Sequence, residues 1–365
     1  MNDNKTSKNS IVAKFAVPIS FLILFFLAAN FTDCDLVTFW KRRNHLTDLV
    51  VDMIPPDFSY IQKILLPLFY TIQMSVTGTV LGTFFALVLS PFGAANLGFP
   101  AVIRRILRIV IQILRSFPAL ILALTATFLF GLGTFAGTFA ITLYTFAIMT
   151  KLTYEDASAA DVKAYQALRV MGVSKYVAYI HGILPEIIPG FLTNALYLLE
   201  TNVRHSSILG YVGAGGIGLL LNEKISWLEY DKVGTILLML FLTVCVIEYF
   251  SRYLAALIRK ERTIKKKQAR LLLLFLAALF LICTFTLSLP DFSRTSPQTL
   301  RNMFAGFLQP DWSFFFSAEK DGLGYLLLET VCIAFIGTVI GAIVSAPLAF
   351  LNTKRFVPAP VSFLF

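Results

Sequence analysis

Apolar stretches long enough to cross a lipid bilayer recur along almost the whole chain. A membrane-spanning helix needs about 20 predominantly apolar residues. Inside a bilayer the backbone must satisfy its own hydrogen bonds, so such runs fold as helices. The sequence therefore predicts an all-α integral membrane protein, a polytopic helical bundle with about eight transmembrane helices. The predicted spans are roughly 15–32, 64–90, 107–130, 132–150, 189–210, 233–257, 270–289 and 324–350.

The composition supports a membrane protein. Of the 365 residues, 57% are hydrophobic and 14% are charged, whereas a soluble domain has about 45–50% apolar and about 25% charged residues. A net charge of +10 would suggest nucleic acid in a soluble protein. Here the basic residues lie between apolar runs, so we expect membrane anchoring and no nucleic acid. The four cysteines lie far apart and fit neither a disulfide framework nor a metal site.

The basic residues also predict an orientation, because lysines and arginines concentrate in cytoplasmic loops. The first apolar run follows three lysines and is interpreted as a retained signal-anchor span with its N-terminus inside. One cluster, Lys41-Arg42-Arg43, falls outside in this arrangement. The regions that fall inside are the N-terminus with Lys5, Lys8 and Lys14, the stretch from Arg104 to Arg115, residues 151–175, and the run from Arg259 to Arg270.

Two parts of the chain carry the same pattern. Residues 71–82 match residues 330–341, including a pair of glycines four residues apart in each. Similarity at such a long period signals a duplicated architecture. An even number of predicted spans separates the copies, so the repeat is parallel. We therefore predict a first repeat over residues 1–260 and the start of a second, truncated repeat over residues 261–365.

A charged segment, residues 151–188, lies between two predicted spans. Gly172 is expected to end a first helix, and Ser174 to cap a second helix that runs through Ile183 and stops at Leu184-Pro185. Such a helix–turn–helix suits a groove on a partner protein, while the alternative is a helix resting on the membrane surface. The first helix has one apolar stripe formed by Ala164, Ala167, Leu168 and Met171.

Polar residues end the predicted span 189–210. Ionisable groups at the rim of a span are expensive and often functional, and a guanidinium binds phosphoryl oxygens well. The simpler interpretation, which we favour for the pair, is that Glu200 and Arg204 bond only to each other at i,i+4. The candidates for a translocation path are Glu200, Asn202, Arg204 and Ser206.

The run from Gly213 to Gly218 fits the spacing G-x-G-x-x-G literally. A dinucleotide site needs a strand before this motif and a helix after it, whereas here the motif follows a predicted span. We expect a tight turn or a close approach of helices instead. The sequence contains neither a phosphate loop of the form G-x4-G-K-[ST] nor a catalytic constellation. We therefore expect no enzymatic activity, and any ATP hydrolysis must be done by a separate protein.

Several segments resemble the phosphonate ABC-transporter permease family over about residues 60–260, and residues 310–352 are like the start of a second copy. The family's coupling motif E-A-A-x3-G-x9-I-x-L-P aligns with residues 166–185, with Gln166 in place of Glu and Gly182 in place of Ile. Residues 200–204 and 212–218 resemble further family segments in the same order. The resemblance implies a loop that couples to an ATPase through Gln166, Ala167, Leu168, Gly172, Ser174, Lys175, Leu184 and Pro185.

The resemblance further implies a MetI-like permease in the bacterial inner membrane, with residues 1–260 comprising the signal-anchor span and the permease core. Its partners would be cytoplasmic ABC ATPase subunits, an extracytoplasmic substrate-binding protein and a second permease half or copy. The solute would be phosphonate or a related phosphorus oxyanion. An ABC permease for an amino acid or metal complex remains an alternative. A secondary transporter is another, although its spans offer few carboxylates beyond Glu200, Glu248 and Glu329.

Overall fold

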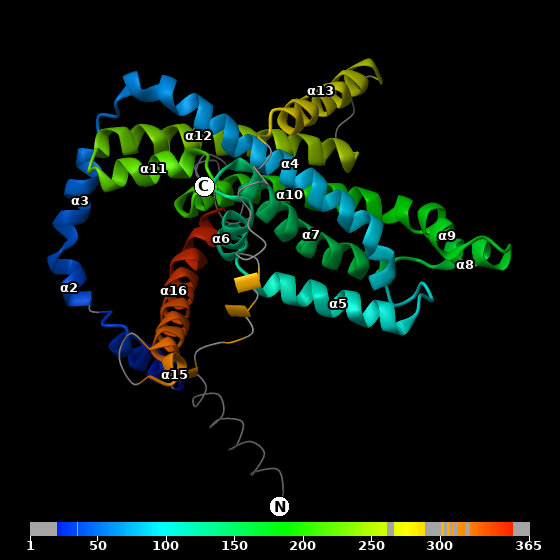
Figure 1. Cartoon of the computed structure of the whole chain (residues 1–365), viewed down its shortest axis with the longest axis horizontal. Coiled ribbons are helices and arrows are strands. Elements are labelled where there is room, and N and C mark those ends of the chain that lie inside the picture. Colours follow the sequence, from blue (N-terminus) through cyan, green and yellow to red (C-terminus); the bar gives the residue numbers. More distant parts are fainter. Residues whose placement is uncertain are drawn as a thin grey trace, which may run out of the picture. The chain divides into compact units, whose positions relative to one another are not determined.

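The computed structural model describes residues 20–34, 36–260, 266–288, 301–302, 305–306, 309, 312–317 and 322–352. These described residues form helices and no strand, which confirms the all-α prediction. Contacts gather the chain into two units: a core unit of residues 49–303, and a terminal unit of residues 1–48 with 304–365 (Figure 1). The N-terminal lysines and the start of the first predicted span lie outside the described residues.

Two long helices, α4 (Ile61–Gly93) and α7 (Thr134–Ala159), form the centre of the core unit. They approach closely because α4 presents glycines to α7: a methyl group built on Gly82 would lie 2.7 Å from the carbonyl oxygen of Thr142. Small residues of this kind let membrane helices pack backbone to backbone. Four buried hydroxyls along α4 donate to carbonyls one turn back, and they belong to Thr71, Ser75, Thr79 and Thr83.

The span predicted over residues 107–130 is not one straight helix, because the structure has a bent pair of helices there that passes as a span only when the two are taken together. Helix α5 (Ala101–Ser116) and helix α6 (Ala119–Phe130) meet at an angle of 94°. The break falls at Phe117-Pro118, where proline lacks an N–H group and forces the preceding residue into an extended conformation. The break between α6 and α7 lies at Gly131 and Gly133, where the predicted span 107–130 gives way to the span 132–150, with φ angles of 82° and 142° that favour glycine.

The core unit also contains α10 (Leu184–Leu209), α11 (Ile217–Ser226), α12 (Tyr230–Ile258) and α13 (Lys266–Phe285). Helix α10 packs on α4, α7 and α12, and α13 packs on α4, where Gln73 Nε2 donates to the carbonyl oxygen of Cys283 at 3.0 Å. Among the described residues, five helices of the chain are long and apolar enough to span a membrane, or up to seven if each bent pair is one span.

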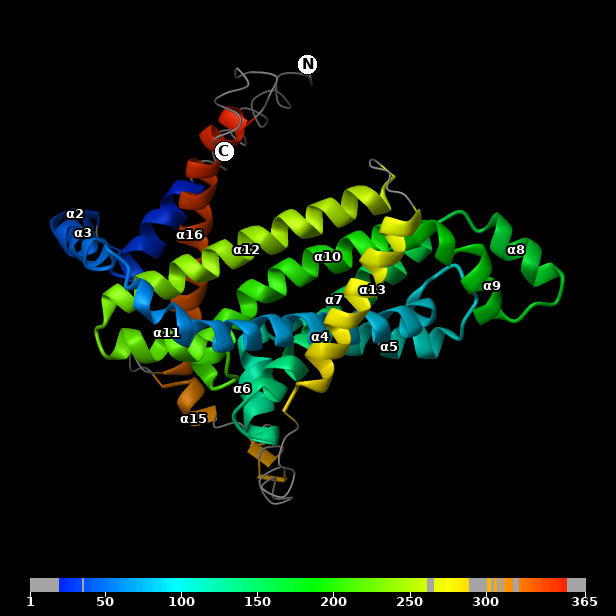
Figure 2. The same ribbon diagram turned by 90° about the horizontal axis from the view of Figure 1, so that it is seen from above.

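The core unit has two distinct ends (Figure 2). One end carries the short helices α8 (Lys163–Val170) and α9 (Lys175–Gly182) beside the C-terminus of α4 and the N-terminus of α5. The other end, which we call the glycine end, carries α11 and the turn where the Gly133 N–H donates to the Gly213 carbonyl at 3.0 Å. Most basic residues of the core unit cluster at the first end, in keeping with the predicted orientation.

The glycine-rich run forms a tight turn, as predicted. Gly213, Gly215 and Gly216 all have φ between 73° and 81°. The turn also permits close contact, since a methyl group built on Gly218 would lie 1.8 Å from the carbonyl oxygen of Ser207. A helix precedes and follows this turn, so the strand that a dinucleotide site requires is replaced by α10.

The terminal unit contains a helix over residues Ser20–Phe31, helix α2 (Leu36–Lys41), the start of α3 (Arg43–Asp52), α15 (Trp312–Phe315) and α16 (Leu323–Asn352). The first of these corresponds to the predicted span 15–32 and packs on α16 through the ring pairs Phe21–Phe335 and Phe31–Tyr325, with centroids 5.1 and 4.9 Å apart. Helix α16 contains residues 330–341, whose sequence matches residues 71–82 of α4. The predicted repeat boundary near residue 260 remains a prediction.

Candidate functional site

Helices α8 and α9 form a helix–turn–helix, called here the finger, at one end of the core unit (Figures 1 and 2). Gly172 turns the chain with φ at 85°, where glycine has no steric penalty. Ser174 then caps α9, its hydroxyl accepting from the Val177 N–H at 3.4 Å. Both features were predicted from the sequence. Leu184 and Pro185 begin α10 directly after the finger, at a bend of 70°.

The inner side of the finger is bound to the loop between α4 and α5. Tyr165 donates its hydroxyl to the carbonyl oxygen of Leu97 at 2.6 Å. The Lys175 ammonium donates to the Gly98 carbonyl and lies 5.9 Å from the centre of the Phe99 ring. These bonds connect the finger to the loop that joins α4 and α5. The finger core is completed by the buried residues Ala94, Leu97, Ala157, Tyr165, Ala178, Tyr179, Ile183 and Ile187.

The outer side of the finger is apolar and exposed at its turn. Val170 is 90% exposed and Met171 70% exposed. Exposed apolar residues that gather at one place mark an interaction site. The predicted single stripe is corrected here: Leu168 packs inward on the finger core, whereas the other members face outward with Gln166. The exposed surface, called here the fingertip, consists of Ala164, Ala167, Val170 and Met171.

Gly182 has a structural reason to be glycine. A methyl group built on it would lie 2.8 Å from the Tyr165 backbone nitrogen and 2.9 Å from the Tyr165 Cα. The two finger helices therefore touch backbone to backbone at this point. At this position, where the resembled motif has isoleucine, the structure leaves no room for a side chain.

The candidate path residues on α10 divide between two sides of the helix. Asn202 is completely buried, and its Nδ2 donates to the hydroxyls of Thr79 and Thr145, both at 2.8 Å. Ser206 is also buried and bonds to the Ser75 hydroxyl at 3.0 Å. In this structure these two side chains join α10 to α4 and α7, as polar groups commonly do between membrane helices, and they lie away from the exposed surface.

Glu200 and Arg204 lie on the other side of α10. The Arg204 guanidinium donates to the Glu200 carboxylate, which confirms the predicted pairing. The Arg204 side chain is 49% exposed, so half of it remains open to a further ligand. Tyr197, one helical turn away from Glu200, is also exposed. A role for Arg204 in translocation therefore stays a prediction.

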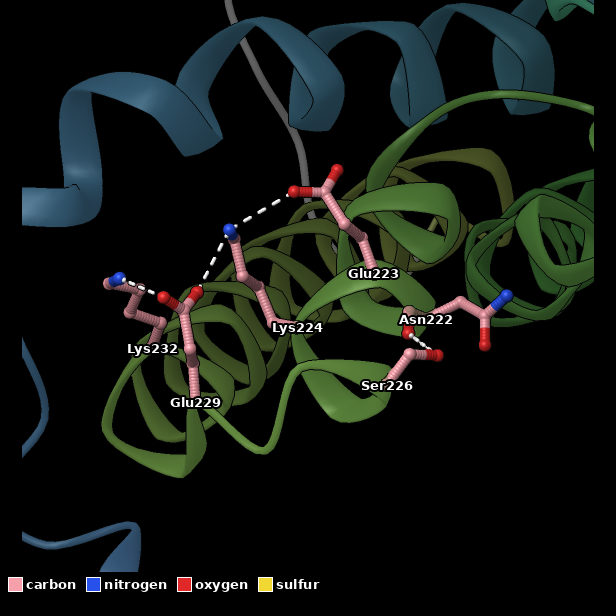
Figure 3. Close-up of polar contacts among 6 residues, drawn as sticks. All are labelled: Asn222, Glu223, Lys224, Ser226, Glu229 and Lys232. Carbon is pink, nitrogen blue, oxygen red and sulfur yellow. Dashed lines mark hydrogen bonds and ion pairs between the residues drawn. The ribbon is translucent and has the colours of Figure 1, made fainter.

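A buried lysine at the glycine end was missed by the sequence analysis. Lys224, at the end of α11, lies between the carboxylates of Glu223 and Glu229 at 3.0 and 2.9 Å (Figure 3). Lys232 donates to the same Glu229 at 2.7 Å. Hydrogen bonding to Glu229 raises the pKa of Lys224 above its ordinary value. The adjacent Glu-Lys pair was the only signal in the sequence, and it gave no hint of burial.

The Lys224 ammonium also lies over two aromatic rings, 4.3 Å from the centre of Trp227 and 5.5 Å from that of Tyr60. Tyr60 directly precedes α4 and is buried. Lys224 therefore ties the α11–α12 connection to the start of α4. Cation–π contacts of this kind are stronger when the cation is shielded from water.

Comparisons with known proteins agree with this architecture. The family described as "Binding-protein-dependent transport system inner membrane component" matches residues 78–260. The phosphite transport system permease protein PtxC of Stutzerimonas stutzeri is 30% identical over 217 residues, which are 60% of this chain and 79% of that protein. A putative cryptic phosphonate transport system permease protein, PhnE2 of Escherichia coli K12, is 30% identical over 115 residues, or 32% of this chain and 94% of that protein.

A solved structure supports the fold. An inward-facing conformation of the MetNI methionine ABC transporter matches with a TM-score of 0.50 at 21% identity, over 55% of this chain and 99% of the matched chain. At this identity the similarity concerns the fold alone. It confirms the predicted MetI-like bundle.

Proposed function

The chain belongs to the family of inner membrane components of binding-protein-dependent transport systems, and from that premise we propose that it is the permease subunit of an ATP-driven importer of a phosphorus oxyanion. Relatives named as phosphite and phosphonate permeases support this solute class. Coupling to an ATPase is supported by the fingertip, which is an exposed apolar surface on a segment outside the candidate membrane spans.

The proposed partner at the fingertip is a cytoplasmic ABC ATPase. An exposed valine and methionine on a rigid helix–turn–helix suit a hydrophobic groove, and methionine adapts to such surfaces. The chain lacks a phosphate loop of its own, so ATP must act through a second protein. Gln166, Ala167 and the turn at Gly172 would meet the groove, while Ser174 and Lys175 hold the finger in shape.

The proposed transmission runs from the finger into the bundle. A pull on the finger acts on the α4–α5 loop through Tyr165 and Lys175, and on α10 through Leu184 and Pro185 at the 70° bend. The ATPase must bind one arrangement of these helices more tightly than the other, since only differential affinity shifts an equilibrium. An extracytoplasmic binding protein would deliver the solute at the glycine end, and a second permease half or copy would complete the path.

Crosslinking tests the ATPase contact. In a variant whose native cysteines are replaced, Met171→Cys should form a crosslink with an ATPase subunit in native membranes. Leu132→Cys is the matched control, because Leu132 is equally open, at 81% exposed, but lies at the glycine end. Capture from Leu132 and never from Met171 would contradict the proposal.

Uptake assays test the solute and the energy source. Cells that express the chain with its ATPase and binding protein should take up labelled phosphite or methylphosphonate, with methionine unable to compete. Methionine competition would favour the alternative of an amino-acid permease. A secondary transporter would keep its uptake when ATP is depleted and the proton gradient persists, whereas an ABC importer would lose it.

A further inference from the structure

One side of α5 carries arginines that have no acidic partner. The positions i, i+4, i+8 and i+11 of this helix are occupied by Arg104, Arg108, Gln112 and Arg115. Residues at this spacing line one side of a helix with about 3.6 residues per turn. Arg105 lies at the edge of the same side. Among the described residues, no carboxylate lies within ion-pair distance of these four arginines. We call these five residues the arginine strip.

The strip differs from the other two sides of α5. The second side of α5 faces the rest of the core unit: Ile111 is buried there, and Leu107 and Leu114 are half-buried. A guanidinium in hydrocarbon is expensive, so the strip is expected to face water or a polar cavity. The remaining side provides a separate surface for lipid, formed by the exposed residues Val102, Ile106, Val110 and Ile113.

Part of the strip is fixed in place and part is free. Arg108 Nε donates to the Gly93 carbonyl at 3.0 Å, and its guanidinium lies 5.0 Å from the centre of the Tyr154 ring. Arg105 and Arg115 are exposed and make no hydrogen bond or ion pair with the described residues. Their donors are therefore available to a ligand beside a positioned arginine.

A hollow of about 220 Å³ opens along the strip. It is smaller than the roughly 300–1,000 Å³ typical of sites for drug-sized ligands, so it suits a small ion. Guanidinium groups bind phosphoryl oxygens through paired N–H donors. The hollow is lined by Ala101, Arg104, Arg105, Arg108, Ile109 and Gln112.

We propose that the arginine strip binds a phosphorus oxyanion in transit toward the finger end of the core unit. This inference rests on the proposed function and adds a site to it. Arg104 and Arg115 are separated by about 16 Å along the helix, at 1.5 Å per residue, which is more than half of a hydrocarbon core of about 30 Å. A lipid phosphate at the membrane surface would reach only the Arg104 end, whereas a crossing solute would meet both ends.

The test compares Arg105→Gln/Arg115→Gln with the unchanged full chain, reconstituted in neutral-lipid nanodiscs. Both residues lack bonds in the structure, so folding should be unaffected. Arg252→Gln, at an exposed arginine on α12 that pairs with Glu248 at 2.8 Å, controls for the loss of a positive charge away from the strip. Phosphite and methylphosphonate are the probes in binding and in uptake with the partner proteins. Each lost guanidinium should weaken binding about tenfold, and binding should fall as salt rises.

The outcomes separate the possible failures. Equal binding and uptake by the double variant and the unchanged chain would contradict solute binding by the arginine strip and leave the proposed function intact. No binding or uptake by the unchanged chain would overturn the proposed function itself. A third arm uses nanodiscs with phosphatidylglycerol and native mass spectrometry. If the double variant loses retained lipid but keeps phosphite binding, the strip holds a headgroup and the assignment to a transported solute fails.

Discussion

At the scale of single residues, Gly182 shows how one missing side chain sets the packing of the finger. A methyl group there would lie 2.8 Å from the Tyr165 backbone, which cannot move away as a flexible side chain could. Gly182→Ala should therefore destabilise the finger by about 1–3 kcal/mol through overpacking. Hydrogen exchange at the α8 and α9 amides measures this directly.

The matched control for that substitution is Gly190→Ala. Gly190 lies inside α10 and has nothing within 4 Å of a built methyl group. The same change should there be neutral or stabilise the helix by up to about 1 kcal/mol, because alanine is the better helix former. Equal exchange rates in the two variants would contradict the packing account.

Also at the residue scale, the Lys224 cluster predicts a dependence on pH. Hydrogen bonds from Lys232 and Lys224 lower the pKa of Glu229 below its ordinary 4.5, and the bond to Glu229 raises that of Lys224 above 10.5. The lowered pKa of Glu229 contributes stability above pH 4.5 that is lost as the pH falls further. The raised pKa of Lys224 contributes stability below pH 10.5 that is lost as the pH rises further.

Trp227 reports on this cluster, because the Lys224 ammonium lies 4.3 Å from its ring centre. With Trp40 and Trp312 replaced by phenylalanine, Trp227 emission should stay constant between pH 4.5 and pH 10.5, and change only as the pH falls through the lowered pKa of Glu229 or rises through the raised pKa of Lys224. Glu229→Gln should shift the emission at neutral pH and abolish the acid transition. An unchanged acid transition in that variant would assign it to another group.

At the scale of helices, the two repeat copies offer a matched experiment. A methyl group on Gly78 of α4 would lie 2.7 Å from Ile141 Cγ2 and 3.0 Å from the Thr138 carbonyl oxygen, both on α7. Its equivalent, Gly337 of α16, has nothing within 4 Å among the described residues. Gly78→Ala should thus cost about 1–3 kcal/mol of stability.

Gly337→Ala should leave stability unchanged or slightly raised. Thermal unfolding of the full chain in detergent compares the two variants. If both were equally destabilising, an additional helix would have to pack on α16 in the purified protein. If neither substitution lowered stability, the close packing of α4 on α7 at Gly78 would be contradicted.

At the scale of the whole molecule, the sequence predicted those features that depend on local pattern. Hydropathy located the long helices, glycine and serine preferences located the turn at Gly172 and the cap at Ser174, and the i,i+4 spacing predicted the Glu200–Arg204 pair. It failed where contacts between distant segments decide. Asn202 is buried because α4 and α7 pack around it, and neither the inward turn of Leu168 nor the burial of Lys224 has a local signature.

The difference between the two ends of the core unit predicts how the bundle is oriented in the membrane. Basic residues cluster at the finger end, and cytoplasmic loops carry the excess of lysine and arginine. With the native cysteines replaced, Val170→Cys in the finger, 90% exposed, should react with a membrane-impermeant maleimide only in inverted vesicles. Leu132→Cys at the glycine end should react only in intact spheroplasts. The proposed coupling role requires the finger to meet an ATPase in the cytosol, so the opposite labelling pattern would exclude both the orientation and that role.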